Sequence, residues 1–199
     1  MPDAPQAPVG VILAGGRGQR IGGAKATIGL AGRPLISYPL AAMQAAMGEV
    51  AVVAKSDTPL PPLSQVPIWT EPAQPEHPLL GIVTALRRAA GRAVLVCAVD
   101  MPFISPGLLR ALAVAPSGQA PAVVAACAGA LTPTLGRYEP AALAMLEASA
   151  AEARAPLRAV VVQTLAPARF EVADSGELFN VNTPQDLVEA ERMLRASRR

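Results

Sequence analysis

Short apolar runs alternate with amphipathic stretches along the first two thirds of the chain. The apolar runs, rich in Val, Leu and Ala, predict buried strands at residues 9–14, 50–54, 66–70, 93–99 and 122–126. Between them, apolar positions at helical spacing predict helices at residues 35–46, 82–90 and 106–113. Strands that alternate with helices form parallel sheets covered on both faces. We therefore expect an α/β fold, a three-layer Rossmann-like arrangement with a mostly parallel central sheet.

The pattern is looser in the last third and becomes clear again near the end. Beyond Gly129 it predicts a strand at 131–138, helices at 141–150 and 157–162, and a strand at 169–172. The stretch FNVNTPQDLVEAERML then carries a helix start, with Thr183 as N-cap, Pro184 at the first helical position and Asp186 at the third. This is a capping box with Asp in place of Glu, and it predicts a final helix.

Composition fits one compact unit. Hydrophobic residues make up 52% of the 199 residues and charged residues 16%, which excludes intrinsic disorder and leaves ample apolar surface for a core. We expect a single domain over residues 1–199, in which residues 1–8 are a flexible proline-rich leader. The net charge of +2 is too small to indicate a nucleic-acid partner.

The N-terminal segment and the cysteines indicate in which cellular compartment the protein is expected. The segment MPDAPQAP has an acid and prolines where a secretory signal has basic residues, and no apolar run of about 18 residues follows, so no membrane partner is expected. Cys97 and Cys127 lie in apolar strand-like runs, which favours buried small hydrophobic residues over a disulfide or a metal site. We expect a cytoplasmic protein.

A glycine-rich basic loop follows the first predicted strand. Its glycines and cations are Gly15, Gly16, Gly18, Gly22, Gly23, Arg17, Arg20 and Lys25. The loop is not a Walker A motif, because Ala26 follows Lys25, and it is not a dinucleotide fingerprint, because Ile21 stands at the third glycine position. Glycines let backbone amides approach phosphate and the cations neutralise it. We expect this loop to bind phosphate at the carboxyl ends of the strands.

Asp100 ends the most hydrophobic predicted strand, in VLVCAVDMPF. A charge there is costly to desolvate unless it meets a cation or hydrogen-bond donors, so Asp100 is a candidate metal ligand. Asp100 could equally cap the turn that precedes Pro102 and Ser105, and the residues alone favour neither interpretation.

Several motifs together resemble one enzyme family. They are LAGGRGQRIGG with a lysine shortly after, LAGRPL, the Asp-Met-Pro step at a strand end, and FNVNTP before the last helix. In this combination the chain resembles the molybdenum cofactor guanylyltransferases, within the larger nucleotidyltransferase group, from Val9 to the last helix. The resemblance implies a nucleotidyltransferase fold and transfer of GMP from GTP to the phosphate of molybdopterin, with release of pyrophosphate. It also implies Mg²⁺ as cofactor, and proteins that insert molybdenum or accept the product as further partners.

The resemblance also assigns roles at the phosphates. It implies a nucleotide site lined by backbone near Leu13, Ala14, Gly15 and Gly16. Lys25 would hold the triphosphate, Arg20 would assist it, and Asp100 would bind Mg²⁺.

Base and acceptor recognition are assigned in the same way. Glu71, in PIWTEP, aligns with an acidic residue that contacts the base, and a carboxylate can accept from both N1–H and the 2-amino group of guanine, which favours GTP over CTP. Gly81, Asn180 and Asn182 are substrate candidates, with helix capping and local hydrogen bonds as alternatives. His77, the only histidine, is expected in a solvent-facing loop.

Two positions depart from the family pattern. Ala24 stands where an aspartate usually precedes the lysine, and Ala54 stands where an asparagine is common, with Lys55 as a partial substitute. Two alternatives therefore stay open. One is an enzyme of the same fold that uses CTP or another phosphorylated acceptor, and the other is a nucleotide-binding module with weakened catalysis.

Overall fold

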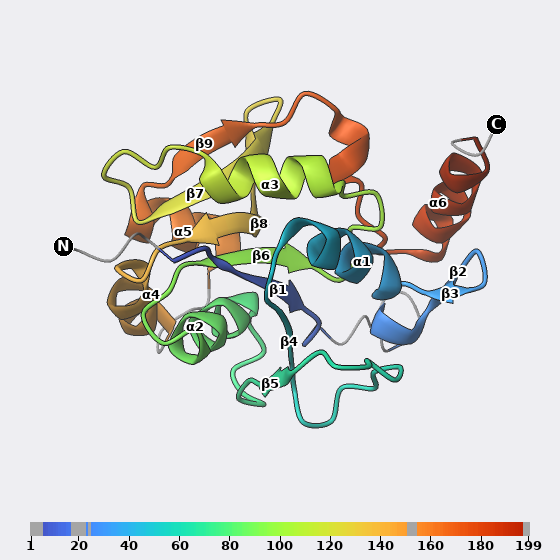
Figure 1. Ribbon diagram of the computed structural model, residues 1–199, viewed down its shortest axis with the longest axis horizontal. Helices are drawn as coiled ribbons and strands as arrows, with labels where there is room; N and C mark the ends of the chain where they lie inside the picture. Colours follow the sequence, from blue (N-terminus) through green and yellow to red (C-terminus); the bar gives the residue numbers. More distant parts are fainter. Residues whose placement is uncertain (1–5, 17–22, 24, 151–154, 197–199) are drawn as a thin grey trace.

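A seven-stranded sheet forms the centre of the molecule in a computed structural model, which describes residues 6–16, 23, 25–150 and 155–196 (Figure 1). The strand order is β5-β4-β1-β6-β8-β7-β9. The strands are β1 (Val9–Leu13), β4 (Val50–Ala54), β5 (Ile68–Thr70), β6 (Val94–Ala98), β7 (Ala122–Cys127), β8 (Ala130–Tyr138) and β9 (Ala168–Glu171). Four neighbouring pairs are parallel and the two pairs that involve β8 are antiparallel, so the prediction of a mostly parallel sheet is confirmed.

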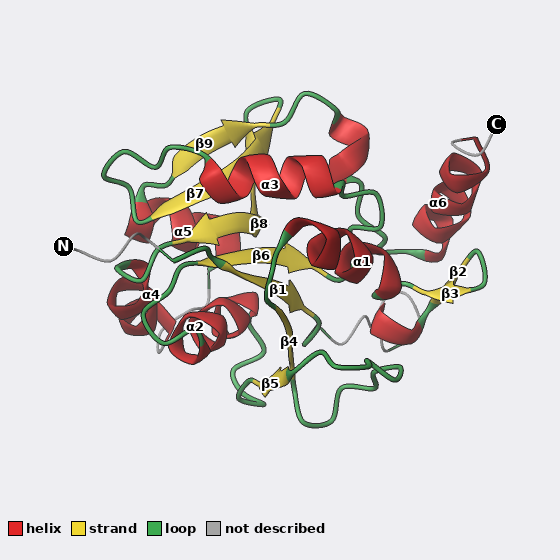
Figure 2. Cartoon of the chain, in the orientation of Figure 1, coloured by secondary structure: helices red, strands yellow, loops and turns green. Residues whose placement is uncertain are grey.

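Helices cover both faces of the sheet (Figure 2). They are α1 (Ser37–Ala46), α2 (Pro78–Arg88), α3 (Pro106–Val114), α4 (Ala142–Ala150), α5 (Leu157–Leu165) and α6 (Pro184–Ala196). Helices α1 and α3 share one apolar cluster with the sheet, and α2, α4 and α5 share another. In β1, Ile12 belongs to the first cluster and its neighbour Val11 to the second. Successive residues of a strand face opposite sides of the sheet, and here both sides are buried. The central strands are therefore apolar at every position, which explains the continuous apolar runs in the sequence.

Helix α6 stands at the edge of the molecule beside a small hairpin of β2 (Gly29–Leu30) and β3 (Arg33–Pro34) (Figure 1). Leu30, Leu35, Val181 and Ala190 form a separate buried cluster between them. The hairpin was not predicted, because its two-residue strands are too short to show a period.

The capping box at the start of α6 is confirmed. The amide of Asp186 donates to Thr183 Oγ1 at 3.2 Å, and the amide of Thr183 donates to Asp186 Oδ2 at 2.9 Å. The backbone N–H of Asn182 donates to the same oxygen at 2.9 Å, so the Asp186 carboxylate satisfies two backbone donors ahead of the helix.

Two features that the sequence did not predict shape the site: the early start of α2 and the direction of β8. Helix α2 starts at Pro78 instead of residue 82, because His77 acts as N-cap and its Nδ1 accepts from the Leu79 amide at 3.2 Å. Strand β8 runs antiparallel to β7, because only Ala128 and Gly129 connect them, both at positive φ. A parallel crossover needs a far longer connection.

The structure describes part of the predicted leader and both cysteines. Of the predicted leader, residues 1–5 lie outside the described residues, while the Ala7 carbonyl accepts from Arg92 Nη2 at 2.8 Å. Cys97 is fully buried, and burial raises the pKa of its thiol, with the Asp100 charge acting in the same direction. Cys127 is only half-buried, contrary to expectation, because it ends β7.

Among the described helices, none is long and apolar enough to cross a membrane.

Candidate active site

Strand order brings distant segments together at one edge of the sheet. Residues Leu13, Val53 and Ala98 lie side by side in the parallel register, so the chain leaves β1, β4 and β6 at the same edge. Strand β5 joins them, since Thr70 pairs with Ala54. The segments that follow these four strands are therefore neighbours in space, as expected for ligand sites of open α/β sheets.

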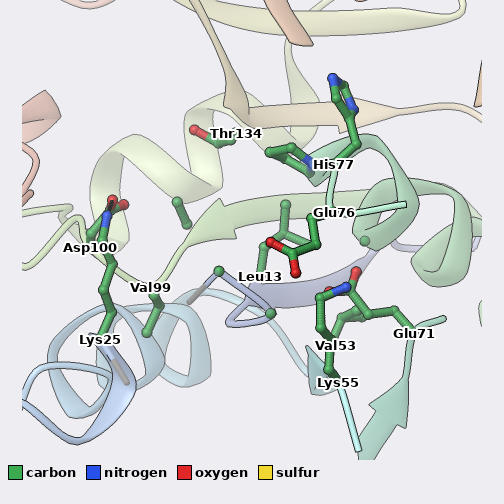
Figure 3. A pocket seen from close by; sticks show the side chains of 15 residues that line it. Leu13, Lys25, Val53, Lys55, Glu71, Glu76, His77, Val99, Asp100 and Thr134 are labelled. Atoms are coloured by element: carbon green, nitrogen blue, oxygen red, sulfur yellow. Dashed lines mark hydrogen bonds and ion pairs between the residues drawn. The ribbon is translucent and has the colours of Figure 1, made fainter. Parts of the chain in front are cut away.

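A pocket occupies this edge, and Figure 3 shows its lining side chains. The lining residues are Leu13, Gly15, Gly16, Lys25, Val53, Lys55, Glu71, Glu76, His77, Pro78, Gly81, Ala98, Val99, Asp100 and Thr134. Charged groups gather at two ends, with Lys25 and Asp100 at one and Lys55 and Glu71 at the other (Figure 3). The pocket thus holds two separate ion pairs, and the Glu76 side chain lies between them in this view (Figure 3).

Lys25 and Asp100 form the first end. The Lys25 ammonium donates to Asp100 Oδ2 and to Asn182 Oδ1, each at 2.6 Å. The side chains of Lys25 and Asp100 are 15% and 13% exposed, so both charges are largely desolvated and depend on each other. Lys25 therefore ties the segment after β1 to the segment after β6 and to the start of α6.

Asp100 does not act as a local turn cap among the described residues. The cap of α3 is Ser105, whose Oγ accepts from the Leu108 amide at 3.1 Å. Asp100 Oδ1 is buried and has no hydrogen-bond partner within the described part of the chain. A buried carboxylate oxygen without a partner suits a metal ligand, so the residues present fit a divalent cation at this point.

A cation at Asp100 would need ligands from elsewhere. Within the described ranges, no three His, Cys, Asp or Glu side chains gather closely enough to hold a metal by themselves. Mg²⁺ is commonly held by one or two carboxylates together with substrate phosphates and water. The donor set at Asp100 matches that mode of binding and not a closed structural site.

Glu71 and Lys55 form the second end. Lys55 Nζ lies 3.5 Å from Glu71 Oε1, and both side chains are 6% exposed. The same ammonium donates to the carbonyls of Pro72 at 3.0 Å and Ala73 at 3.2 Å. Burial raises the pKa of Glu71 above the ordinary glutamate value, and the Lys55 charge partly opposes that rise.

Two glycines make room for the Glu71 carboxylate. A Cβ at Gly15 would lie 1.7 Å from Glu71 Oε1, and a Cβ at Gly81 would lie 3.1 Å from Oε2. Gly81 is in the first turn of α2 but does not cap it, since His77 is the cap. The sequence alternatives for Gly81 were substrate approach and capping, and the structure shows a third reason, the packing of Glu71.

The structure places most predicted site residues at this pocket. Leu13, Gly15, Gly16, Lys25, Glu71, Gly81 and Asp100 all line it. Ala14 is buried beside them, with its amide donating to Val53 O at 2.8 Å, and Asn182 contacts the pocket through Lys25. Asn180 donates to Leu178 O at 2.8 Å, which matches the local alternative. Arg20 and Ala24 lie outside the described residues.

The departure at Ala54 has a structural outcome. Ala54 is fully buried in β4, whereas Lys55 is the residue that reaches the pocket. Lys55 therefore supplies the polar group at this strand end, and it does so as a cation beside Glu71.

Among the lining residues that the sequence did not predict, three have polar side chains: Glu76, His77, which was expected in a solvent-facing loop, and Thr134. His77 is half-buried, and its Nε2 lies 2.9 Å from the Ala155 carbonyl while Nδ1 accepts from Leu79, so Nε2 carries the proton. Pro78 at the first helical position was a signal for this cap. Thr134 could not be found from the sequence, because only the antiparallel register of β8 brings it beside the end of β6.

Comparisons with known proteins agree with this architecture. The MobA-like NTP transferase domain matches residues 10–168. A Cereibacter sphaeroides protein named molybdenum cofactor guanylyltransferase is 34% identical over 190 residues, which cover 94% of this chain and 96% of that protein. A second relative of the same name, from Rhizobium leguminosarum, is 33% identical over 203 residues, which cover 95% of this chain and 94% of that protein.

Solved structures support the fold. Molybdopterin-guanine dinucleotide biosynthesis protein A from Archaeoglobus fulgidus superposes with a TM-score of 0.77 at 22% identity, over 94% of this chain and 99% of that one. A Mycobacterium tuberculosis protein solved in complex with manganese has a TM-score of 0.68 at 16% identity, over 94% and 99% of the two chains. By domain match and by full-length identity, the chain belongs to the molybdenum cofactor guanylyltransferase family of MobA-like NTP transferases.

Proposed function

We propose that this protein transfers GMP from GTP to the phosphate of molybdopterin, releasing pyrophosphate and forming molybdopterin guanine dinucleotide. The relatives named molybdenum cofactor guanylyltransferase support the reaction class. The observation that carries the proposal is one pocket with a carboxylate for a base at one end and a lysine-aspartate pair for phosphates at the other.

The Glu71 end suits guanine. An ionised carboxylate is an acceptor with no donor, and guanine offers two adjacent donors, N1–H and the 2-amino group. Cytosine offers only one amino donor on the corresponding edge. The Glu71 carboxylate is held against Gly15 and Gly81, so its oxygens have a defined position when a base enters.

The Lys25 end suits the triphosphate. The Lys25 ammonium neutralises phosphate charge, and the backbone of Gly15 and Gly16 borders the same space. Mg²⁺ held by Asp100 and phosphate oxygens would offset the charge that builds as the bond to pyrophosphate breaks. Lys25 keeps Asp100 paired until the nucleotide supplies an alternative partner for its ammonium.

The chain needs no nucleophile of its own for this reaction. A phosphate oxygen of molybdopterin forms the new bond to the α-phosphorus of GTP, and the bond to the β-phosphate oxygen breaks, so pyrophosphate leaves with the electron pair. The protein's contribution is positioning and charge neutralisation. Cys97, the buried thiol nearest in sequence to Asp100, is excluded as a nucleophile by its burial and raised pKa.

The direct test is pyrophosphate release from purified protein with molybdopterin and each nucleoside triphosphate in turn, with Mg²⁺, Mn²⁺ or a chelator. We expect release with GTP and a divalent cation, and none with the chelator. No release with GTP, or preferential turnover of CTP, would overturn the proposal.

The alternatives have less support. The relatives by full-length identity are guanylyltransferases, which disfavours CTP or an unrelated acceptor. The hypothesis of a nucleotide-binding module with weakened catalysis depends on Ala24 and Ala54, and it predicts that Ala24→Asp raises activity from nothing measurable. We further expect the enzyme to act in the cytoplasm and to pass its product to molybdoenzymes, together with proteins that insert molybdenum.

A further inference from the structure

Lys55 has a place in the pocket that the phosphate chemistry does not use. It follows β4 directly and its side chain is 6% exposed, which is rare for a lysine. It lies at the Glu71 end, away from Lys25 and Asp100 (Figure 3). A buried ammonium is retained only where partners stabilise its charge, so its contacts indicate its role.

The contacts of Lys55 divide between backbone and carboxylate. Two of them are hydrogen bonds to the carbonyls of Pro72 and Ala73, at 3.0 and 3.2 Å, in the segment that directly follows Glu71. The third is Glu71 Oε1, at the longer distance of 3.5 Å. The backbone carbonyls therefore hold the ammonium beside Glu71 Oε1, where its positive charge favours the ionised form of the carboxylate.

Glu71 needs such a neighbour. Its carboxylate is enclosed by Gly15 and Gly81, and both sides of this enclosure are uncharged backbone. Burial favours the neutral acid, and a neutral acid carries a donor on one oxygen. A base with two adjacent donors would then meet one donor and lose a hydrogen bond, so guanine selectivity depends on the charge state of Glu71.

We propose that Lys55 is a specificity-determining positioning residue, which keeps Glu71 ionised so that this side chain accepts from the guanine base of GTP and donates nothing to it. The inference rests on the proposed function. Lys55 acts through Glu71 and does not contact the reacting atoms.

Other charged groups line the same pocket, and their effect on pH dependence must be separated from that of Glu71. Glu76 and His77 line it from the segment before α2, and Lys25 and Asp100 line the opposite end. Glu71→Gln removes the Glu71 charge and leaves these groups in place. The pH dependence that remains in Glu71→Gln therefore belongs to them and to the nucleotide, and it is the baseline for every comparison.

The test begins with protein free of nucleotide, so that it does not depend on GTP. The carboxyl carbon of Glu71, labelled with ¹³C and assigned by its loss in Glu71→Gln, is titrated by NMR in the wild type and in variants. Lys55→Gln keeps a donor near the backbone carbonyls but removes the charge, and we expect the Glu71 midpoint to rise by about one to three pH units. Lys55→Arg keeps the charge, and we expect a midpoint close to the wild type.

The second measurement is the affinity for GTP and CTP over the same pH range. In Lys55→Gln, GTP affinity should fall about tenfold for each pH unit below the new Glu71 midpoint and recover above it. Selectivity for GTP over CTP should fall with it. When Lys55→Gln is added to Glu71→Gln, the affinities for GTP and CTP should not change further.

The outcomes separate the inference from the proposed function. An unshifted Glu71 midpoint in Lys55→Gln, or a loss of GTP affinity that is equal at every pH, overturns the role of Lys55 and leaves the guanylyltransferase proposal standing. Wild-type protein that binds CTP more tightly than GTP overturns the proposed function, whatever the NMR midpoint shows. If Lys55→Gln fails to fold, Lys55→Met takes its place. Failure of both neutral variants while Lys55→Arg folds assigns Lys55 a structural role and overturns the inference.

Discussion

The ammonium of Lys25 lies 2.6 Å from Oδ2 of Asp100, a residue 75 positions away in the sequence. Each charge is the principal partner of the other in a largely desolvated site, while the second oxygen of Asp100 is left without a partner among the described residues. A nucleotide with a divalent cation would meet both groups at once. We therefore expect activity to fall most when a charge of this pair is removed.

Asp100→Asn should lower the rate of pyrophosphate release on the order of 100-fold or more, because the cation and Lys25 both lose a charged partner. Nucleotide-dependent stabilisation should also lose its dependence on Mg²⁺, as measured by thermal shift with GTP with and without Mg²⁺. Asp57→Asn, on an exposed aspartate, is the matched control and should leave both measurements unchanged. Full Mg²⁺ dependence in Asp100→Asn would contradict the assignment.

Asn182→Ala should reduce activity more than Asn180→Ala. The Asn182 amide oxygen accepts from Lys25 at 2.6 Å, whereas the Asn180 amide donates to the Leu178 carbonyl two residues back. We expect Asn182→Ala to cost about 1 kcal/mol of stability through the lost hydrogen bond, with a higher KM for GTP. Steady-state kinetics and chemical denaturation measure both variants, and equal effects would show that contact with Lys25 is not what makes Asn182 matter.

Gly15→Ala should displace Glu71. A Cβ at Gly15 would lie 1.7 Å from Glu71 Oε1, so the carboxylate must move, and overpacking of this kind costs about 1 to 3 kcal/mol. GTP binding, measured by titration calorimetry, should be lost. Gly48→Ala is the control, since a Cβ there meets no atom within 4 Å.

A double variant sharpens this prediction. In Gly15→Ala with Glu71→Ala the clash is absent, so stability should recover toward that of Glu71→Ala alone, while guanine selectivity stays lost. A double variant as unstable as the sum of the two single variants would mean that Gly15 is required for its backbone and not for the space it leaves to Glu71.

The capping box of α6 should make stability depend on pH in the acid range. The amides of Asn182 and Thr183 donate to Asp186, and hydrogen bonding from the Asn182 amide is the main cause that lowers the pKa of this carboxyl. The contribution is fully present above the ordinary aspartate pKa of about 3.9 and is lost as pH falls through the lowered folded-state value. Thr183→Ala should cost about 1 kcal/mol.

Denaturant unfolding at pH 7 and at pH 3 measures this contribution. Asp186→Asn should abolish the part of the acid sensitivity that comes from this cap. Gln185→Ala, at the neighbouring exposed position, should leave the acid sensitivity as in the wild type. An Asp186→Asn variant with undiminished acid sensitivity would locate that sensitivity elsewhere.

Periodicity and capping signals determined the α/β class, most strands and the last helix, because burial on both faces and the needs of a helix end are local properties of the chain. The sequence also pointed to Lys25, Glu71 and Asp100 through the loop, the strand ends and the family motifs. The early start of α2 was not predicted, although Pro78 is a local signal for a helix start, because histidine is an uncommon N-cap residue.

Tertiary structure alone decided how those residues meet. The strand order β5-β4-β1-β6 sets Glu71, Lys55, Gly15 and Asp100 in a row that differs from their order in the chain. The enclosure of Glu71 by two glycines and the burial of Lys55 follow from that order. The contact of Lys25 with Asn182, 157 residues away, depends instead on the segment before α6, where the Val181 amide donates to the Asp100 carbonyl at 2.9 Å. The hydrophobic pattern indicates which face of each strand is buried, but not which strand lies beside it. Two strands with the same pattern could exchange places in the sheet, and the pattern would stay the same.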